Sequence, residues 1–168
     1  EDDPEERTHA IEQMDGTIVF NNVYFGYEED NNVLHGITFE AKAGSVTALV
    51  GSSGSGKSTI AGLAASFLTP LKGEVTIDGQ DLVQVNLSSY RKHLGVVLQD
   101  DFLYEGTIRE NILFPRPDAT EGELISAVNG AYVHEFTDRF ELGLDTVIGE
   151  RGVKLSGGQR QRIAIARA

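Results

Sequence analysis

Cysteine is absent from the 168 residues of this sequence. Neither a disulfide framework nor a thiolate metal site is therefore possible. Long apolar runs are missing as well, since no segment approaches the roughly 20 apolar residues that a membrane-spanning helix needs. The first residues are acidic, unlike the basic and then apolar start of a secretory signal. On these grounds we expect a soluble domain.

Basic residues are also scarce. The chain has 14 Lys and Arg against 26 Asp and Glu, for a formal net charge of -12. This balance argues against a nucleic-acid partner, whose phosphates would require a basic face. It does not argue against a phosphate site built locally from backbone N–H groups and one lysine. Residues 1–16 are the most acidic stretch, and we predict a loosely ordered acidic linker there.

A glycine-rich stretch with the pattern Gly51-x-x-x-x-Gly56-Lys57-Ser58 is typical of a phosphate-binding loop. It lies between a strand predicted over 46–50 and a helix predicted over 59–68, and this context disfavours an ordinary flexible loop. Glycines allow the backbone N–H groups to point at phosphates, Lys57 would reach the β- and γ-phosphates, and Ser58 would hold Mg²⁺. The residues expected to bind nucleotide here are Gly51, Ser52, Ser53, Gly54, Ser55, Gly56, Lys57, Ser58 and Thr59.

The remaining pattern predicts a β-rich first part followed by a helical part. A turn is predicted at Asp78-Gly79, and Thr120 with Glu123 has the spacing of a helix capping box. The other predicted strands cover 17–25, 37–40, 74–77 and 95–98, and the other predicted helices cover 88–93 (capped by Ser88), 107–114, 120–129, 131–140 and 156–168.

A second anion site is predicted at Leu155-Ser-Gly-Gly-Gln159. Ser156 can cap the helix that follows, while Gly157 and Gly158 remove side chains that would block a close approach. A helix N-terminus with free N–H groups attracts anions. This site and the phosphate loop could serve one ATP within a chain, or two ATPs across a symmetric dimer.

Taken together, these motifs resemble the nucleotide-binding domain of an ATP-binding-cassette (ABC) transporter, of the exporter type. The resemblance covers residues 17–168, with the motifs in the family's order. It implies an α/β P-loop NTPase with an antiparallel β part, a RecA-like core and a helical subdomain over about 102–155 that carries the X-loop.

The resemblance also implies roles for individual residues, with ATP and Mg²⁺ as cofactors. Tyr27 matches the aromatic that stacks on adenine, and Gln99 matches the glutamine that contacts Mg²⁺ and joins Lys57 among the catalytic residues. Leu155–Gln159 would contact the ATP of a second nucleotide-binding domain in a head-to-tail dimer. The Gln99 loop and residues 102–112 and 146–152 would face a transmembrane domain at the cytoplasmic side of the membrane.

One part of the family pattern is missing from this sequence. No apolar run followed by Asp-Glu occurs, so the Walker B aspartate, the water-activating glutamate and the later switch histidine have no counterpart. The resemblance thus implies a truncation before Walker B, with an absent core strand and exposed apolar surface. We expect weak nucleotide binding and poor or no hydrolysis. Two alternatives remain: a soluble ABC ATPase not linked to transport, and a nucleotide-binding fragment with no chemistry.

Overall fold

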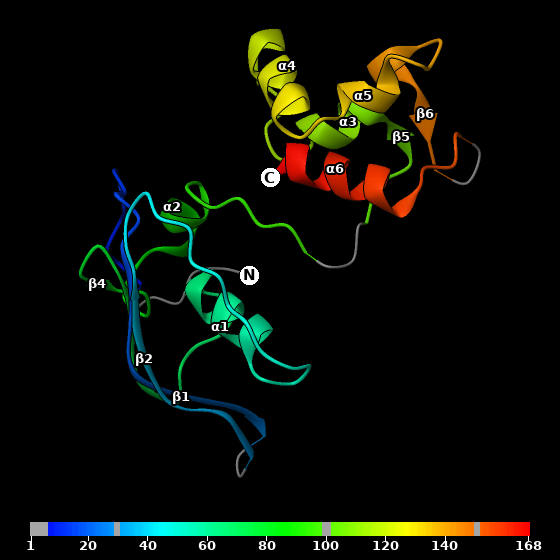
Figure 1. The fold of residues 1–168 in the computed structure, drawn as a ribbon. Coiled ribbons are helices and arrows are strands. Elements are labelled where there is room, and N and C mark those ends of the chain that lie inside the picture. Colours follow the sequence, from blue (N-terminus) through cyan, green and yellow to red (C-terminus); the bar gives the residue numbers. More distant parts are fainter. Residues whose placement is uncertain (1–6, 29–30, 99–101, 150–151) are drawn as a thin grey trace. The chain divides into compact units, whose positions relative to one another are not determined.

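The computed structural model describes residues 7–28, 31–98, 102–149 and 152–168, and it divides the chain into two compact units (Figure 1). The first unit comprises residues 1–94 and the second residues 95–168. Each unit has its own hydrophobic core, so each can be described by itself.

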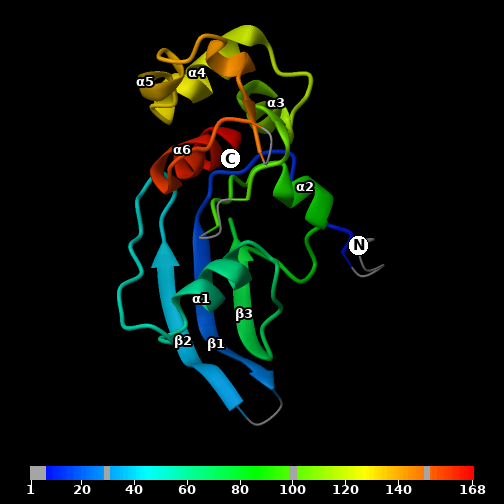
Figure 2. The same ribbon diagram turned by 90° about the vertical axis from the view of Figure 1, so that its right-hand side faces the viewer.

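An antiparallel sheet forms the first unit, with the strand order β2-β1-β3-β4. Figure 2 shows β2, β1 and β3 side by side, with α1 lying across one face. Phe20 pairs with Phe39 on one side and Val75 on the other, and its ring stacks on Phe39. The core lies between sheet and helix, where Leu63 of α1 is buried with the strand residues. The elements are β1 (Ile18–Glu28), β2 (Asn31–Ala41), α1 (Lys57–Ala64), β3 (Lys72–Ile77), β4 (Gln80–Asp81) and α2 (Leu87–Arg91).

The predicted turn at Asp78-Gly79 is confirmed as the two-residue connection between β3 and β4. Both residues have positive φ, 49° and 81°, as the tight hairpin turn requires. The Asp78 carboxylate accepts hydrogen bonds from the backbone N–H groups of Asp15, Gly16 and Thr17, with distances from 2.8 to 3.1 Å. Burial alone would raise the pKa of Asp78, but these backbone hydrogen bonds outweigh it and lower the pKa. The turn therefore anchors the start of β1.

We expect Asp78→Asn to lower the free energy of unfolding by about 1 kcal/mol at pH 7, because the amide keeps the turn but loses the charge-assisted hydrogen bonds. The pKa of Asp78 in the folded protein lies below the ordinary aspartate value of 3.8, so the carboxylate stabilises the fold above that value and stops doing so as pH falls through the folded pKa. Urea unfolding from pH 7 to pH 3 should show the difference between the two proteins closing below about pH 4. Asp118→Asn, at an exposed position, is the control. A difference independent of pH would show that shape rather than charge is responsible.

Residues 7–16 differ from the loosely ordered linker that the acidic composition predicts. Arg7 donates to the Ser66 hydroxyl at 2.9 Å, and the backbone N–H of Ile11 donates to the Ser89 hydroxyl at 3.0 Å. His9 exchanges backbone hydrogen bonds with Gln84 and Asn86, and the Ile11 side chain is buried in the core. The segment is attached because one apolar side chain and several backbone groups find partners in the first unit. Residues 1–6 lie outside the described part of the chain.

Two strand predictions, 46–50 and 95–98, are wrong for this structure. Neither segment forms a strand, and Val46 and Val50 are 98% and 90% exposed. A strand buried on both faces needs hydrogen-bonding neighbours, and no described strand pairs with either segment. Both segments carry exposed apolar side chains, among them Val50 and Leu98.

The second unit is helical, and α6 packs against α3 and α4 (Figure 1). Thr107 caps α3 and Thr120 caps α4, each in a capping box with the glutamate three residues later. The hydrophobic core of the second unit is formed by apolar side chains from these helices, among them Ile108, Leu124 and Ile163. The elements are β5 (Gly106–Thr107), α3 (Ile108–Leu113), α4 (Glu121–Gly130), α5 (His134–Thr137), η1 (Gly143–Asp145), β6 (Val147–Ile148) and α6 (Gly157–Arg167).

Several helices are shorter than their patterns predict. The helix expected over 59–68 is α1, which begins at Lys57 and already ends at Ala64. The helix expected over 88–93 is α2, which begins one residue earlier and is capped by Asn86 rather than by Ser88. The helix expected over 131–140 is reduced to α5, because Tyr132 has a positive φ of 56° that a continuous helix cannot contain. Among the helices of the described residues, none has the length and apolar character that a membrane crossing requires.

Candidate functional site

The predicted phosphate loop leads directly into α1, with Gly56 at the N-cap position. Gly56 has the left-handed conformation, with φ 85° and ψ 6°, and Gly54 also has positive φ. No side chain caps α1. The first N–H groups of this helix thus have no capping oxygen, and an anion can take that place.

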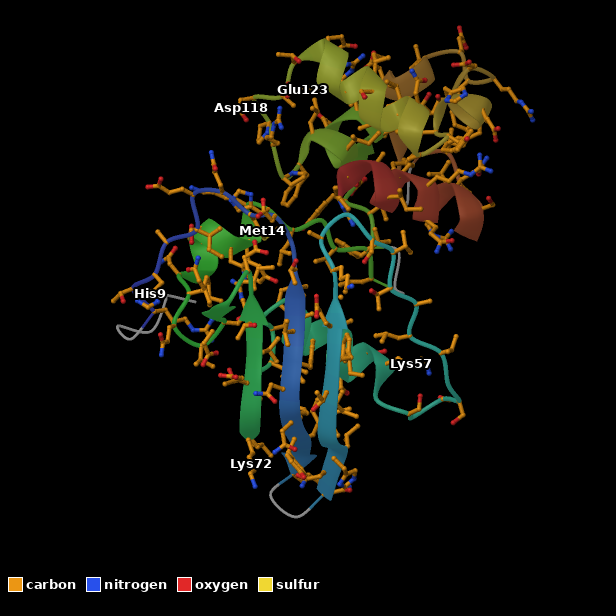
Figure 3. The ribbon with its side chains drawn as sticks, turned by 60° about the vertical axis from the view of Figure 1, so that its left-hand side comes forward. His9, Met14, Lys57, Lys72, Asp118 and Glu123 are labelled. Carbon is orange, nitrogen blue, oxygen red and sulfur yellow. The ribbon has the colours of Figure 1, made fainter. Side chains whose placement is uncertain are left out.

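Lys57 folds back over the loop that precedes it (Figure 3). Its ammonium donates to the carbonyl oxygens of Gly51 and Ser52, at 3.0 and 2.6 Å, and to the Ser55 hydroxyl at 3.2 Å. These contacts hold a positive charge over the loop that precedes α1, and within the described part of the chain no acidic side chain pairs with it. The loop therefore fits a phosphate group by both charge and donor set.

Metal ligation by protein side chains alone is not supported here. Within the described ranges, no group of three or more His, Asp or Glu could hold a metal ion. Ser58, the predicted Mg²⁺ ligand, is exposed on the first turn of α1. Mg²⁺ ordinarily keeps several waters and uses phosphate oxygens with one or two protein ligands, and this arrangement fits such a minimal site.

Tyr27 lies near the end of β1, and its hydroxyl is 3.1 Å from the Thr59 hydroxyl. Its side chain is 66% exposed, while its ring meets Phe25 edge-on at a centroid distance of 5.0 Å. The structure thus places a largely exposed aromatic ring beside the first turn of the phosphate-loop helix. Sequence reasoning did not find the contact with Thr59, because nothing in the local pattern around either residue indicates it.

The predicted second anion site forms the N-terminus of α6. Ser156 caps the helix and Gln159 completes a capping box, with the Gln159 side chain accepting from the Ser156 N–H at 2.8 Å. The Ser156 cap was predicted. The Gln159 role was missed, although the Ser-x-x-Gln spacing is a known capping-box signal. A Cβ added at Gly158 would have nothing within 4 Å, and one added at Gly157 only an arginine nitrogen at 3.7 Å. Packing within this chain therefore does not require glycine at position 157 or 158.

The two segments predicted to face a membrane domain are brought together by β5 and β6, which pair antiparallel. Tyr104 stacks on Phe114 at 4.3 Å and meets Phe102 edge-on at 5.1 Å, and all three rings are exposed. The buried Asn111 side chain holds the Tyr104 backbone by accepting from its N–H and donating to its carbonyl. Gln99 lies outside the described residues, as do positions 150 and 151 of the segment 146–152.

Comparison with known proteins agrees with this arrangement. The family model described as ABC transporter matches residues 34–168. An ATM1-type heavy metal exporter of Novosphingobium aromaticivorans is 49% identical over 90% of this chain and 25% of its own length. An ATP-dependent lipid A-core flippase of Pasteurella multocida is 48% identical over 96% of this chain and 28% of its own length.

A solved structure of a bacterial Atm1-family ABC exporter with ATP bound is similar over 99% of this chain and 29% of its own, with 46% identity and a TM-score of 0.89. The chain therefore spans between a quarter and a third of the length of these relatives. Its fold is that of the ABC cassette, a P-loop NTPase of mixed α/β structure, which confirms the predicted fold class. The chain belongs to the ABC transporter family, and its similarity is to the nucleotide-binding domain of exporters.

Proposed function

We propose that this chain is the ATP-binding part of an ABC exporter and couples ATP binding and hydrolysis to transport across a membrane. The observation that carries the proposal is the phosphate loop. Its helix begins at a left-handed glycine without a side-chain cap, and the Lys57 ammonium is held across the loop by two carbonyl oxygens. This combination supplies free N–H donors and one positive charge, which suits the phosphates of ATP with Mg²⁺ near Ser58.

The N-terminus of α6 supports a second part of the proposal, contact with the ATP of a partner domain. Gly157 and Gly158 are exposed and are not needed for packing within the chain. Side chains at these positions would obstruct only something that approaches from outside. A head-to-tail dimer of nucleotide-binding domains would bring a partner's phosphates there, with Leu155–Gln159 facing them.

The exposed aromatic cluster of Phe102, Tyr104 and Phe114 supports a third part, docking of a transmembrane domain. Together with the β5–β6 pair, it joins the segments 102–112 and 146–152 in one region of the second unit. Exposed aromatic rings that contact one another are typical of protein interaction sites. We propose that the Gln99 loop belongs to the same interface, at the cytoplasmic side of a membrane.

Nucleotide binding and turnover test the proposal separately. The 168-residue chain should bind a fluorescent ATP analogue saturably in the presence of Mg²⁺, and ATP should displace it at least about ten-fold better than adenosine, as expected when charge-assisted hydrogen bonds to phosphate contribute. Phosphate release should be far slower than for a complete cassette, because no residue of this sequence takes the place of the water-activating glutamate.

Two results would contradict this proposal. Absence of saturable binding would remove the assignment of the phosphate loop. Turnover comparable to that of a complete cassette, abolished by Lys57→Ala, would show that hydrolysis does not need the missing motif. If binding is present and turnover is absent, the 168-residue chain binds nucleotide without hydrolysing it.

A further inference from the structure

The C-terminal end of α1, opposite the phosphate loop, is closed by a tight backbone turn. The N–H of Phe67 donates to the Gly62 carbonyl at 2.8 Å, and the N–H of Ser66 donates to the Leu63 carbonyl at 3.0 Å. This pair of hydrogen bonds is a Schellman motif, in which the left-handed position is ordinarily glycine. Here Ser66 takes that position, with φ 55° and only 8% exposure. The serine therefore brings a hydroxyl group to a place that glycine would leave bare.

Two side chains from other parts of the first unit bind this end of the helix. Arg7 donates to the Ser66 hydroxyl at 2.9 Å. The hydroxyl of Tyr90, on α2, donates to the Ala64 carbonyl at 2.6 Å, and the tyrosine is fully buried. Burial raises the pKa of Tyr90 to about 12, so the hydroxyl keeps its proton and remains a donor at neutral pH. Carbonyl groups in the last turn of a helix need donors of this kind from outside the helix.

The same end of α1 is connected to α2 by the N-terminal strap, which we define as residues 7–11 (Figure 2). His9 makes two backbone hydrogen bonds, at 3.1 and 2.8 Å, with the chain just before and at the cap of α2. The N–H of Ile11 donates to the hydroxyl of Ser89, on α2, at 3.0 Å. The strap is therefore attached to α2 by its backbone and to the end of α1 by the Arg7 side chain.

These contacts form a closed ring. The strap binds α2, α2 binds α1 through Tyr90, and α1 binds the strap through Arg7. The helix has eight residues and is therefore about 12 Å long, short enough to move as one body. No side chain caps its other end, at the phosphate loop. Loosening the C-terminal end of α1 should therefore also loosen the N–H groups at its start.

We propose that Arg7 and Tyr90 are positioning residues for α1, through which attachment of the N-terminal strap and binding of phosphate strengthen each other. The inference rests on the proposed function, in which the start of α1 binds the phosphates of ATP. A helix that is already held at one end loses less conformational freedom when a ligand binds at the other. Coupling between two sites is reciprocal, so bound ATP should in turn tighten the strap.

Amide hydrogen exchange, measured by NMR on the full chain, tests the effect of the ligand on the strap. Saturating ATP with Mg²⁺ should slow exchange of the His9 and Ile11 N–H groups about three- to ten-fold, the equivalent of one neutral hydrogen bond. Tripolyphosphate with Mg²⁺ should act like ATP, and adenosine should have no effect, because the coupling acts through the phosphates. The control is the N–H groups of residues 15–17, which bind the Asp78 carboxylate and should change less than about two-fold.

A double variant tests the path through the two side chains. Tyr90→Phe keeps the ring, Arg7→Gln removes the charge, and together they remove both hydrogen bonds to the end of α1. ATP and tripolyphosphate should bind weaker by about the same three- to ten-fold, and adenosine should stay within about two-fold. Protection of the strap by ATP should fall below about two-fold. Tyr24→Phe, which removes a hydroxyl on β1 beside Lys72, is the matched control and should bind ATP like the unchanged protein.

Three outcomes would overturn the inference. Equal slowing of exchange in the strap and at residues 15–17 would show general stabilisation by the ligand. Equal weakening of ATP and adenosine in the double variant would show a loss of folded structure rather than of positioning, and unchanged ATP affinity would show that the ring of contacts does not affect the phosphate site. If the unchanged protein binds neither ATP nor tripolyphosphate, the proposed function itself has failed. If it binds both while exchange in the strap is unaltered, only the coupling has failed.

Discussion

Replacing Lys57 by alanine is expected to weaken ATP binding by about 10- to 100-fold and to leave adenosine binding within about two-fold. The lysine ammonium lies beside the uncapped start of α1, where it would neutralise phosphate charge. Removing it costs hydrogen bonds to a charged ligand, each of which contributes about 1.5–3 kcal/mol. Adenosine has no phosphate and so loses nothing at this position. Competition titration against a fluorescent ATP analogue measures both affinities.

The control for this change is Lys72→Ala. Lys72 lies on β3, and its ammonium is 5.4 Å from the centre of the Tyr24 ring, so the same charge is lost away from the loop (Figure 3). Its ATP affinity should remain close to that of the unchanged protein. Equal weakening of ATP and adenosine by Lys57→Ala would instead indicate that the loop has collapsed, and it would contradict the assignment of this lysine to the phosphates.

Lys57→Arg provides a second comparison at the same position. The guanidinium keeps the charge but is planar and broader, so it cannot donate from one point to the Gly51 and Ser52 carbonyls as the ammonium does. We expect its ATP affinity to fall between those of the unchanged protein and Lys57→Ala. This order would show that both charge and shape matter.

Elements that depend on local sequence were predictable in this chain. The caps of α3, α4 and α6 follow from Thr or Ser at the start of each helix, and the turn at Asp78-Gly79 follows from two residues that tolerate positive φ. The phosphate loop was recognisable for the same reason, because its glycines and lysine have fixed spacing along the chain.

Features that depend on distant partners were not predictable. The apolar runs at 46–50 and 95–98 have strand-like composition, yet a strand forms only where a neighbour supplies hydrogen bonds. The anchoring of residues 15–17 depends on a carboxylate about 60 positions away. The contact between Tyr27 and Thr59 likewise requires a particular packing of β1 on α1. Local pattern carries no information about such pairs.

Gly56 combines a left-handed backbone conformation with close packing against Leu34. Gly56→Ala is expected to lower the free energy of unfolding by about 2–5 kcal/mol. The left-handed conformation costs a residue with a Cβ about 1–2 kcal/mol, and overpacking adds about 1–3 kcal/mol. The overpacking arises because the new Cβ would lie 2.6 Å from the Leu34 side chain, which is buried in the core. ATP affinity should fall with stability, since the start of α1 must shift.

Gly54→Ala is a matched control for this prediction. Gly54 has nearly the same φ, 81° against 85°, but a Cβ there would have nothing within 4 Å. It should show only the conformational cost of about 1–2 kcal/mol. Chemical denaturation of both variants thus separates backbone strain from steric overlap, and equal losses would contradict a steric role for Gly56.

Leu34→Ala supplies the decisive test of the Gly56 contact. Alone it should cost about 2–5 kcal/mol, because it leaves a cavity in the core. Combined with Gly56→Ala it should cost less than the sum of the two changes, because the alanine methyl at position 56 would occupy part of that cavity. A favourable coupling between the two sites would establish that packing against Leu34 of β2 requires glycine at position 56. Strict additivity would leave the backbone conformation as the reason for glycine at this position.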